Sequence, residues 1–127
     1  MTPDTFRHLA LELPEVMEWV HLGKPDFRVG GRIFATLGDP DGGWGMLALR
    51  PHEQDRLIAS APTVYQSASG AWGLRGYTQV NLAQVDDMTL RPLLLTAWRW
   101  KAGSRLVKRH ASLVEPEGLE APTAVAV

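Results

Sequence analysis

Residues 10–37, ALELPEVMEWVHLGKPDFRVGGRIFATL, constrain the fold more than any other part of this chain. They join the end of a predicted helix to a series of short strands. Gly30-Gly31 separates two runs rich in strand-forming residues, at 27–29 and 32–37. Glycine accepts the positive φ angles that tight hairpin turns demand, so this pattern predicts an antiparallel hairpin in which the phenylalanines of the two runs face each other.

Helices flank this series of strands. Apolar residues at helical spacing predict a first helix that ends near Leu13, because Pro14 cannot continue it. A second helix is expected between Pro51 and Pro62, and a third from a cap at residues 86–87 to a stop at Gly103. Strands are expected at 16–21, 44–49, 64–67 and 77–82, with a glycine-rich loop at 69–76.

The resulting order is α-β-β-β-β-α-β-β-α, with no βαβ alternation. It predicts an α+β two-layer sandwich of three helices on an antiparallel sheet of about five to six strands. We expect residues 1–103 to form one domain. Residues 104–127, basic and then small and apolar, are expected to form a loosely ordered tail.

Composition excludes several classes of protein. The 127 residues contain no cysteine, which rules out disulfides, thiolate chemistry and cysteine-based zinc sites. No segment approaches the roughly 18 apolar residues that a membrane span needs, and the amino-terminal region contains acidic residues and no long apolar run. We therefore expect a soluble, cytoplasmic protein without a membrane partner.

The charge is uneven along the chain. The net charge is −1, yet residues 88–114 contain no Asp or Glu and carry six Lys and Arg residues. Such a segment either creates a patch that attracts anions or simply complements the dipole of its own helix. Both interpretations remain open from the sequence.

No motif for catalysis is visible. The four histidines show no i, i+3 or i, i+4 pairing, and no G-x-S-x-G or S-x-x-K element is present. We therefore expect neither an enzyme nor a metal or cofactor site. Among the five tryptophans, Trp19, Trp44 and Trp98 fit core faces, whereas Trp72 and Trp100 are either packed or free to stack on a partner.

Four segments resemble the MmcQ/YjbR-like family of unknown function. They are ALELP at 10–14, GKPDFRVGGRIFA at 23–35, RPHEQ at 50–54 and WGLRGYTQVNL at 72–82, and the resemblance covers about residues 4–102. It implies a CyaY-like two-layer sandwich, also called a double-wing arrangement, whose members are labelled DNA-binding. Relatives often carry a basic residue at the position of Arg32.

Two functions from different classes remain. The first is a DNA-binding domain that contacts phosphates through a basic hairpin and the carboxy-terminal helix. Its candidate contacts are Lys24, Arg28, Arg32, Arg75, Arg99 and Lys101. The second is a small-ligand or protein-interaction module with no nucleic-acid role, whose cleft would be lined by Phe27, Trp72 and Arg75. Pairing of Arg28 and Arg32 with carboxylates would argue against a phosphate clamp at the hairpin.

Overall fold

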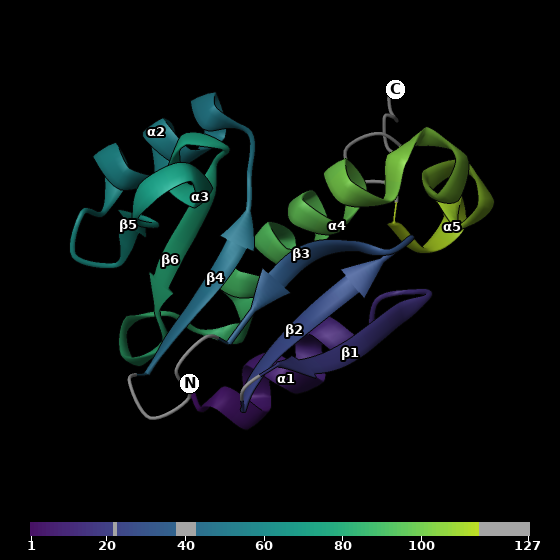
Figure 1. The fold of residues 1–127 in the computed structure, drawn as a ribbon, viewed down its shortest axis with the longest axis horizontal. Helices are drawn as coiled ribbons and strands as arrows, with labels where there is room; N and C mark the ends of the chain where they lie inside the picture. The colour runs from purple at the N-terminus through teal and green to yellow at the C-terminus, as the bar shows by residue number, and fades with distance from the viewer. Residues whose placement is uncertain (22, 38–42, 115–127) are drawn as a thin grey trace, which may run out of the picture.

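A six-stranded antiparallel sheet forms the framework of the protein, in the order β1-β2-β3-β4-β6-β5 (Figure 1). The computed structural model describes residues 1–21, 23–37 and 43–114. The strands are β1 (Val16–His21), β2 (Lys24–Val29), β3 (Arg32–Thr36), β4 (Trp44–Ala48), β5 (Tyr65–Ser67) and β6 (Tyr77–Asn81). The helices are α1 (Pro3–Leu11), α2 (Pro51–Ser60), α3 (Gly70–Leu74), α4 (Asp87–Arg109) and α5 (Ala111–Val114), with a 3-10 turn η2 (Leu82–Gln84). The α+β sandwich with three main helices is thus confirmed.

The main core lies between the sheet and the helices α1 and α4. Helix α4 packs across β3 and β4, and α1 packs against β1, β4 and α4. The core contains Phe6, Phe27, Phe34, Leu47, Leu94 and Trp98, all fully or almost fully buried. Burial of this apolar surface supplies the main stabilisation of the fold. We call the sheet face that carries this core the inner face, and the opposite face the outer face.

The helix caps follow the sequence closely. The Thr2 hydroxyl accepts a hydrogen bond from the Thr5 amide, and Pro3 occupies the first turn of α1. The Asp86 carboxylate accepts one from the Thr89 amide at the start of α4.

Among the described residues, no helix is long and apolar enough to cross a membrane.

The β2–β3 hairpin has the expected turn but not the expected register throughout. Val29 lies opposite Arg32 and Arg28 opposite Ile33, after which a bulge places Phe27 opposite Ala35 instead of Phe34. The extra residue lets both phenylalanines reach the inner face, where both are fully buried. The free energy gained by burying the two aromatic rings outweighs the cost of interrupting the regular hydrogen-bond ladder between β2 and β3.

Two expectations for local structure were wrong. Residues 69–76 contain the short helix α3, not only a loop, because the turn packs tightly on its neighbours. A Cβ on Gly73 would lie 2.0 Å from the Ala68 carbonyl oxygen, so only glycine permits this docking. Gly103 interrupts α4 as expected, with non-helical backbone angles (φ 81°, ψ 168°), but a further helical segment of α4 follows it to Arg109, where no helix was expected.

The kink turns the end of α4 back onto the body of the protein. Leu106 and Val107 pack against the main core, and the ring of His110 lies edge-on to Trp98. The division of the chain at residue 103 stays a prediction, and residues 115–127 of the expected tail lie outside the described residues.

The sheet is weakly joined at its centre. Strands β3 and β4 pair only through Ala35–Leu47 and Thr36–Met46, and then diverge, so that α4 is seen behind the gap between them (Figure 1). A second, smaller apolar cluster lies at this gap. It consists of Ala48, Ala68 and Tyr77, with Ile33, Met46 and Trp100 packed against them. Because Met46 and Ala48 alternate with the inner-face residue Leu47, this cluster belongs to the outer face.

Candidate ligand-binding site

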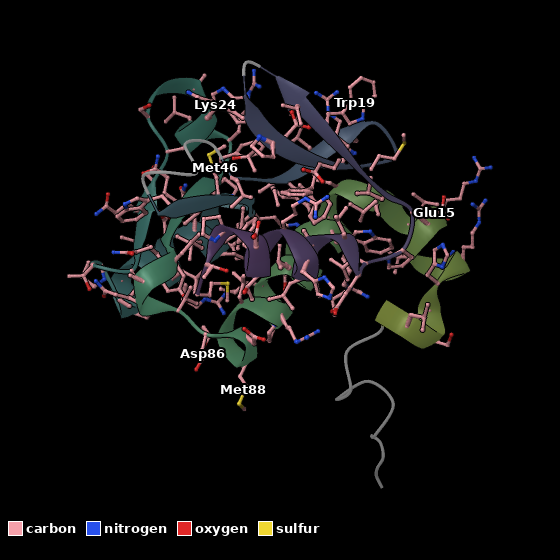
Figure 2. All side chains as sticks on the ribbon, turned by 90° about the horizontal axis from the view of Figure 1, so that it is seen from below. Glu15, Trp19, Lys24, Met46, Asp86 and Met88 are labelled. Atoms are coloured by element: carbon pink, nitrogen blue, oxygen red, sulfur yellow. The ribbon has the colours of Figure 1, made fainter. Side chains whose placement is uncertain are left out.

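A cleft of about 560 Å³ lies on the outer face of the sheet. Strands β2, β3, β4 and β6 form its floor, and α3 with the residues before it forms one wall. Its lining is Lys24, Pro25, Asp26, Arg28, Ile33, Thr36, Met46, Ala68, Ser69, Trp72 and Gln79. This volume and this mixture of apolar and polar side chains suit a small ligand. Figure 2 shows Trp19 and Lys24 on one side of the molecule, away from Asp86 and Met88 at the start of α4.

The cation at the floor of the cleft is already paired. The Arg28 guanidinium donates two hydrogen bonds to the Asp26 carboxylate, of 3.0 and 3.3 Å, and lies 4.9 Å above the Trp19 ring. The hydrogen bonds from Arg28 to Asp26 raise the pKa of the Arg28 guanidinium. Because Asp26 neutralises it, Arg28 lacks the free charge expected of a phosphate clamp.

A cationic cluster adjoins the cleft at the gap between β3 and β4. The Tyr77 ring lies edge-on to Trp72, which lines the cleft, with 4.5 Å between ring centroids. The Lys101 ammonium lies 5.5 Å from the centroid of Tyr77 and 4.2 Å from that of Trp100. Arg50 lies over the same Trp100 ring at 5.4 Å. Cation–π contacts of this kind stabilise charges beside aromatic rings.

Arg32 and Arg75 complete this cluster. Burial lowers the pKa of Lys101, and the charges of Arg32 and Arg75 lower it further. Burial raises the pKa of Tyr77, against an opposing effect of the same two arginines. Within residues 1–21, 23–37 and 43–114, no carboxylate forms an ion pair with Arg32, Arg75 or Lys101. Mutually repelling cations without carboxylates make a site that an anion would stabilise.

The structure separates the residues expected to contact phosphates. Arg32, Arg75 and Lys101 gather around Tyr77, while Lys24 is exposed at the far end of the cleft. Arg99 lies elsewhere, in a groove between α2 and α4 that it shares with Arg50, Glu53, Arg91, Pro92, Leu95 and Thr96. The six expected cations are thus spread over the cleft, the cationic cluster and this groove, which Arg50 joins to the cluster through its contact with Trp100.

The aromatic residues lie partly where they were expected and partly elsewhere. Trp72 lines the cleft as expected. The placement of Phe27 there was wrong, because its ring is fully buried on the inner face, 6.2 Å from that of Phe6. Trp19 was expected in the core and is instead 51% exposed beside Arg28, whereas Trp98 is fully buried as expected. Trp100 packs in the outer-face cluster between two cations.

Sequence reasoning missed Asp26, Gln54 and Tyr77. The Asp26-x-Arg28 spacing was a usable signal, because residues i and i+2 of a strand share one face. Gln54 is buried in α2, and its amide donates to the carbonyl oxygens of Gly73 and Tyr77 at 3.2 and 2.9 Å. Nothing in the sequence distinguishes this glutamine from an exposed one, since its partners are 19 and 23 residues away.

No cluster of three or more His, Cys, Asp or Glu side chains that could hold a metal ion occurs in the part of the chain that the structure describes.

Comparison with known proteins supports the fold. The sequence model of a family described as YjbR matches residues 11–100. The crystal structure of Deinococcus radiodurans protein DR2400, described as a DUF419 domain, is similar with a TM-score of 0.65 and 21% sequence identity. The match covers 95% of this chain and 88% of that one. No curated protein sequence matches this chain.

Proposed function

Because the chain belongs to the YjbR family, whose description names no ligand or reaction, we propose from the geometry that its outer face binds a small organic anion. The observation that carries the proposal is the Lys101 ammonium, which lies against the Trp100 and Tyr77 rings next to Trp72 of the cleft wall. The charges of Arg32 and Arg75 act on it, and none of these three cations has a carboxylate partner among the described residues. A fold alone does not determine a function, so these side chains carry the assignment.

In this proposal the cleft binds the apolar body of the ligand, and the cationic cluster binds its anionic group. Ile33, Met46 and Trp72 offer apolar and aromatic surface to its body. Its anionic group lies against the cationic cluster beyond Tyr77. A charge-assisted hydrogen bond is worth about 1.5–3 kcal/mol, so two arginines could supply most of the affinity of a weak ligand.

Phenyl phosphate, which joins a ring to a dianion, is a suitable probe. In an NMR titration we expect the indole signals of Trp72 and Trp100 to move, while that of the buried Trp98 stays in place. Replacing Arg32→Gln and Arg75→Gln together should weaken binding at least tenfold, or about 1.4 kcal/mol. The matched control is Arg56→Gln with Arg105→Gln, two exposed arginines outside the cluster. Equal affinities of the two double variants would refute the proposal.

DNA binding is a second candidate, favoured by the same cations and by the exposure of Trp19 and Trp72. The pairing of Arg28 with Asp26 and the net charge of −1 weigh against it. Fluorescence anisotropy of labelled duplex DNA from about 50 to about 200 mM salt distinguishes the two. A log–log slope of about −3 or steeper, made shallower by Arg32→Gln with Arg75→Gln, would favour DNA, since each phosphate contact contributes about −0.9.

A further inference from the structure

Strand β1 is an edge strand that lacks the usual protection against pairing with another chain. It lies at one end of the sheet, and no strand of the described residues pairs with its outer edge (Figure 1). It pairs with β2 over six residues without a bulge and contains no proline or lysine. Edge strands usually carry such features, because unpaired backbone N–H and C=O groups attract further strands. The opposite edge is different, since β5 has three residues and packs against α2.

Exposed apolar side chains concentrate on this strand. Of the seven large apolar side chains that are exposed among the described residues, three belong to β1: Met17 (62%), Trp19 (51%) and Val20 (66%). Met17 and Trp19 project from the outer face, since they lie opposite Arg28 and Asp26 of the cleft lining. A contiguous apolar strip beside an unpaired edge indicates an interaction surface.

The surface is also ordered and locally neutral. The Arg28 guanidinium lies 4.9 Å above the Trp19 ring and is itself hydrogen-bonded to Asp26, so the indole is held in place. The one carboxylate of β1, that of Glu18, is compensated by Arg7 at 2.7 Å. Neither loss of side-chain freedom nor an unpaired acidic group therefore opposes association at this edge.

We propose that β1 pairs with β1 of a second copy of this chain, antiparallel and about a two-fold axis, so that the two sheets join into one. Residues paired across an antiparallel ladder lie on the same face, so the axis places one residue opposite itself. The two registers that pair most of β1 centre on Glu18 or on Trp19. Centring on Glu18 would oppose two carboxylates, whereas centring on Trp19 pairs two indoles and sets Glu18 opposite Val20. We therefore assign the register centred on Trp19.

This register makes the two outer faces continuous. Trp19 lies opposite Asp26, Asp26 opposite Thr36, and Thr36 opposite Met46 on successive strands. The last three line the cleft. The row of side chains that begins in one cleft therefore crosses the axis through the two indoles and enters the other cleft. The dimer itself does not depend on the anion site.

Sedimentation equilibrium of the full chain tests dimer formation. Between about 1 and about 500 μM protomer the mass should rise from 14.0 kDa towards twice that value. Trp19→Lys sets two ammonium groups opposite each other and should weaken the dimer at least about tenfold. Leu74→Lys is the matched control, because Leu74 is 84% exposed and lies on α3. A monomer over the whole range, or equal effects of the two variants, would overturn the proposal.

The register is tested by single cysteines, since the chain contains none. Opposed residues of an antiparallel pair have Cα atoms about 4.5–5.5 Å apart, which a disulfide spans, whereas diagonal neighbours are about 7–8 Å apart. Trp19→Cys should therefore cross-link two copies under mild oxidation. Glu18→Cys and Val20→Cys, placed symmetrically about it, should do so much less. Faster cross-linking at residue 18 would overturn the assigned register, and equal rates at all three positions would overturn ordered pairing.

Discussion

The Tyr77 hydroxyl donates a 3.0 Å hydrogen bond to the Ile33 carbonyl oxygen, 44 residues away along the chain. Ile33 lies on β3 and Tyr77 on β6, which pairs with β4. The bond therefore crosses the gap that opens where β3 and β4 part after two pairs of residues. It joins the two halves of the sheet directly beside the cleft, so the shape of the site depends on it.

Removing this hydroxyl tests its role. Tyr77→Phe should lower the free energy of unfolding by about 1 kcal/mol, because a partly buried carbonyl loses its donor. Urea denaturation measures the loss, and amide exchange in β3 and β4 should become faster. Tyr65→Phe is the control, since Tyr65 is also a buried tyrosine and its hydroxyl forms no hydrogen bond among the described residues. Equal losses in the two variants would mean that the bridge contributes nothing specific.

Gln54 should be needed to hold α3 against the sheet. Gln54→Leu removes one of two donors from each of the carbonyl oxygens of Gly73 and Tyr77, which keep the backbone amides of Gly76 and Ala68 as partners. We expect a loss of about 1–2 kcal/mol in the free energy of unfolding, taking about 1 kcal/mol for each lost hydrogen bond. The exposed Gln66 provides the control, and Gln66→Leu should change stability by less than about 0.5 kcal/mol. A neutral Gln54→Leu would show that the two hydrogen bonds of the Gln54 amide do not hold α3 in place.

The elements of this fold were predictable where their signals are local. Proline and cap residues mark the start of α1 and α4, and Gly30-Gly31 marks the turn of the β2–β3 hairpin. The bulge at Phe34 and the continuation of α4 past Gly103 were not predictable, because long-range burial decides both. Helix α3 was missed since its glycines and short length imitate a loop.

The candidate site was only partly predictable for the same reason. Arg32, Arg75 and Lys101 could each be named as exposed cations, but their approach around Tyr77 depends on the gap between β3 and β4. Phe27 was assigned to the cleft because both faces of its hairpin carry apolar residues. Alternation alone could not say which face α4 covers.

Glu15 links the kinked end of α4 to the turn before β1 (Figure 2), and this link should depend on pH. Its carboxylate contacts His110 at 2.6 Å and Arg109 at 3.2 Å. The hydrogen bond with His110, followed by that with Arg109, lowers the pKa of Glu15. A carboxylate with a lowered pKa in the folded state stabilises the fold above its unfolded pKa of about 4.3, and this stabilisation is lost as the pH falls.

Glu15→Gln should therefore flatten the acidic limb of the stability curve measured from about pH 7 to about pH 3. Asp86 also has a lowered pKa, chiefly through the hydrogen bond from the Thr89 amide, so part of the dependence will remain. Glutamine keeps the same positive backbone φ of 58° at this position, so backbone strain cancels in the comparison. Parallel curves for the wild type and the variant would show that Glu15 contributes no pH-dependent stability.

Asp26→Asn should strengthen anion binding. Asp26 is buried and neutralises Arg28 at the floor of the cleft, while asparagine keeps its shape and can still accept a hydrogen bond from the guanidinium. With the carboxylate charge gone, Arg28 presents an uncompensated positive charge to the cleft.

We expect the affinity for phenyl phosphate to rise about threefold or more, or about 0.7 kcal/mol, measured by the same NMR titration. Asp55→Asn changes the net charge equally on exposed α2 and should have little effect. Adding Arg28→Gln to Asp26→Asn should cancel the gain, because the released cation is then removed. If Asp26→Asn instead weakens binding, the anionic group does not approach Arg28, and the carboxylate is needed for the shape of the cleft.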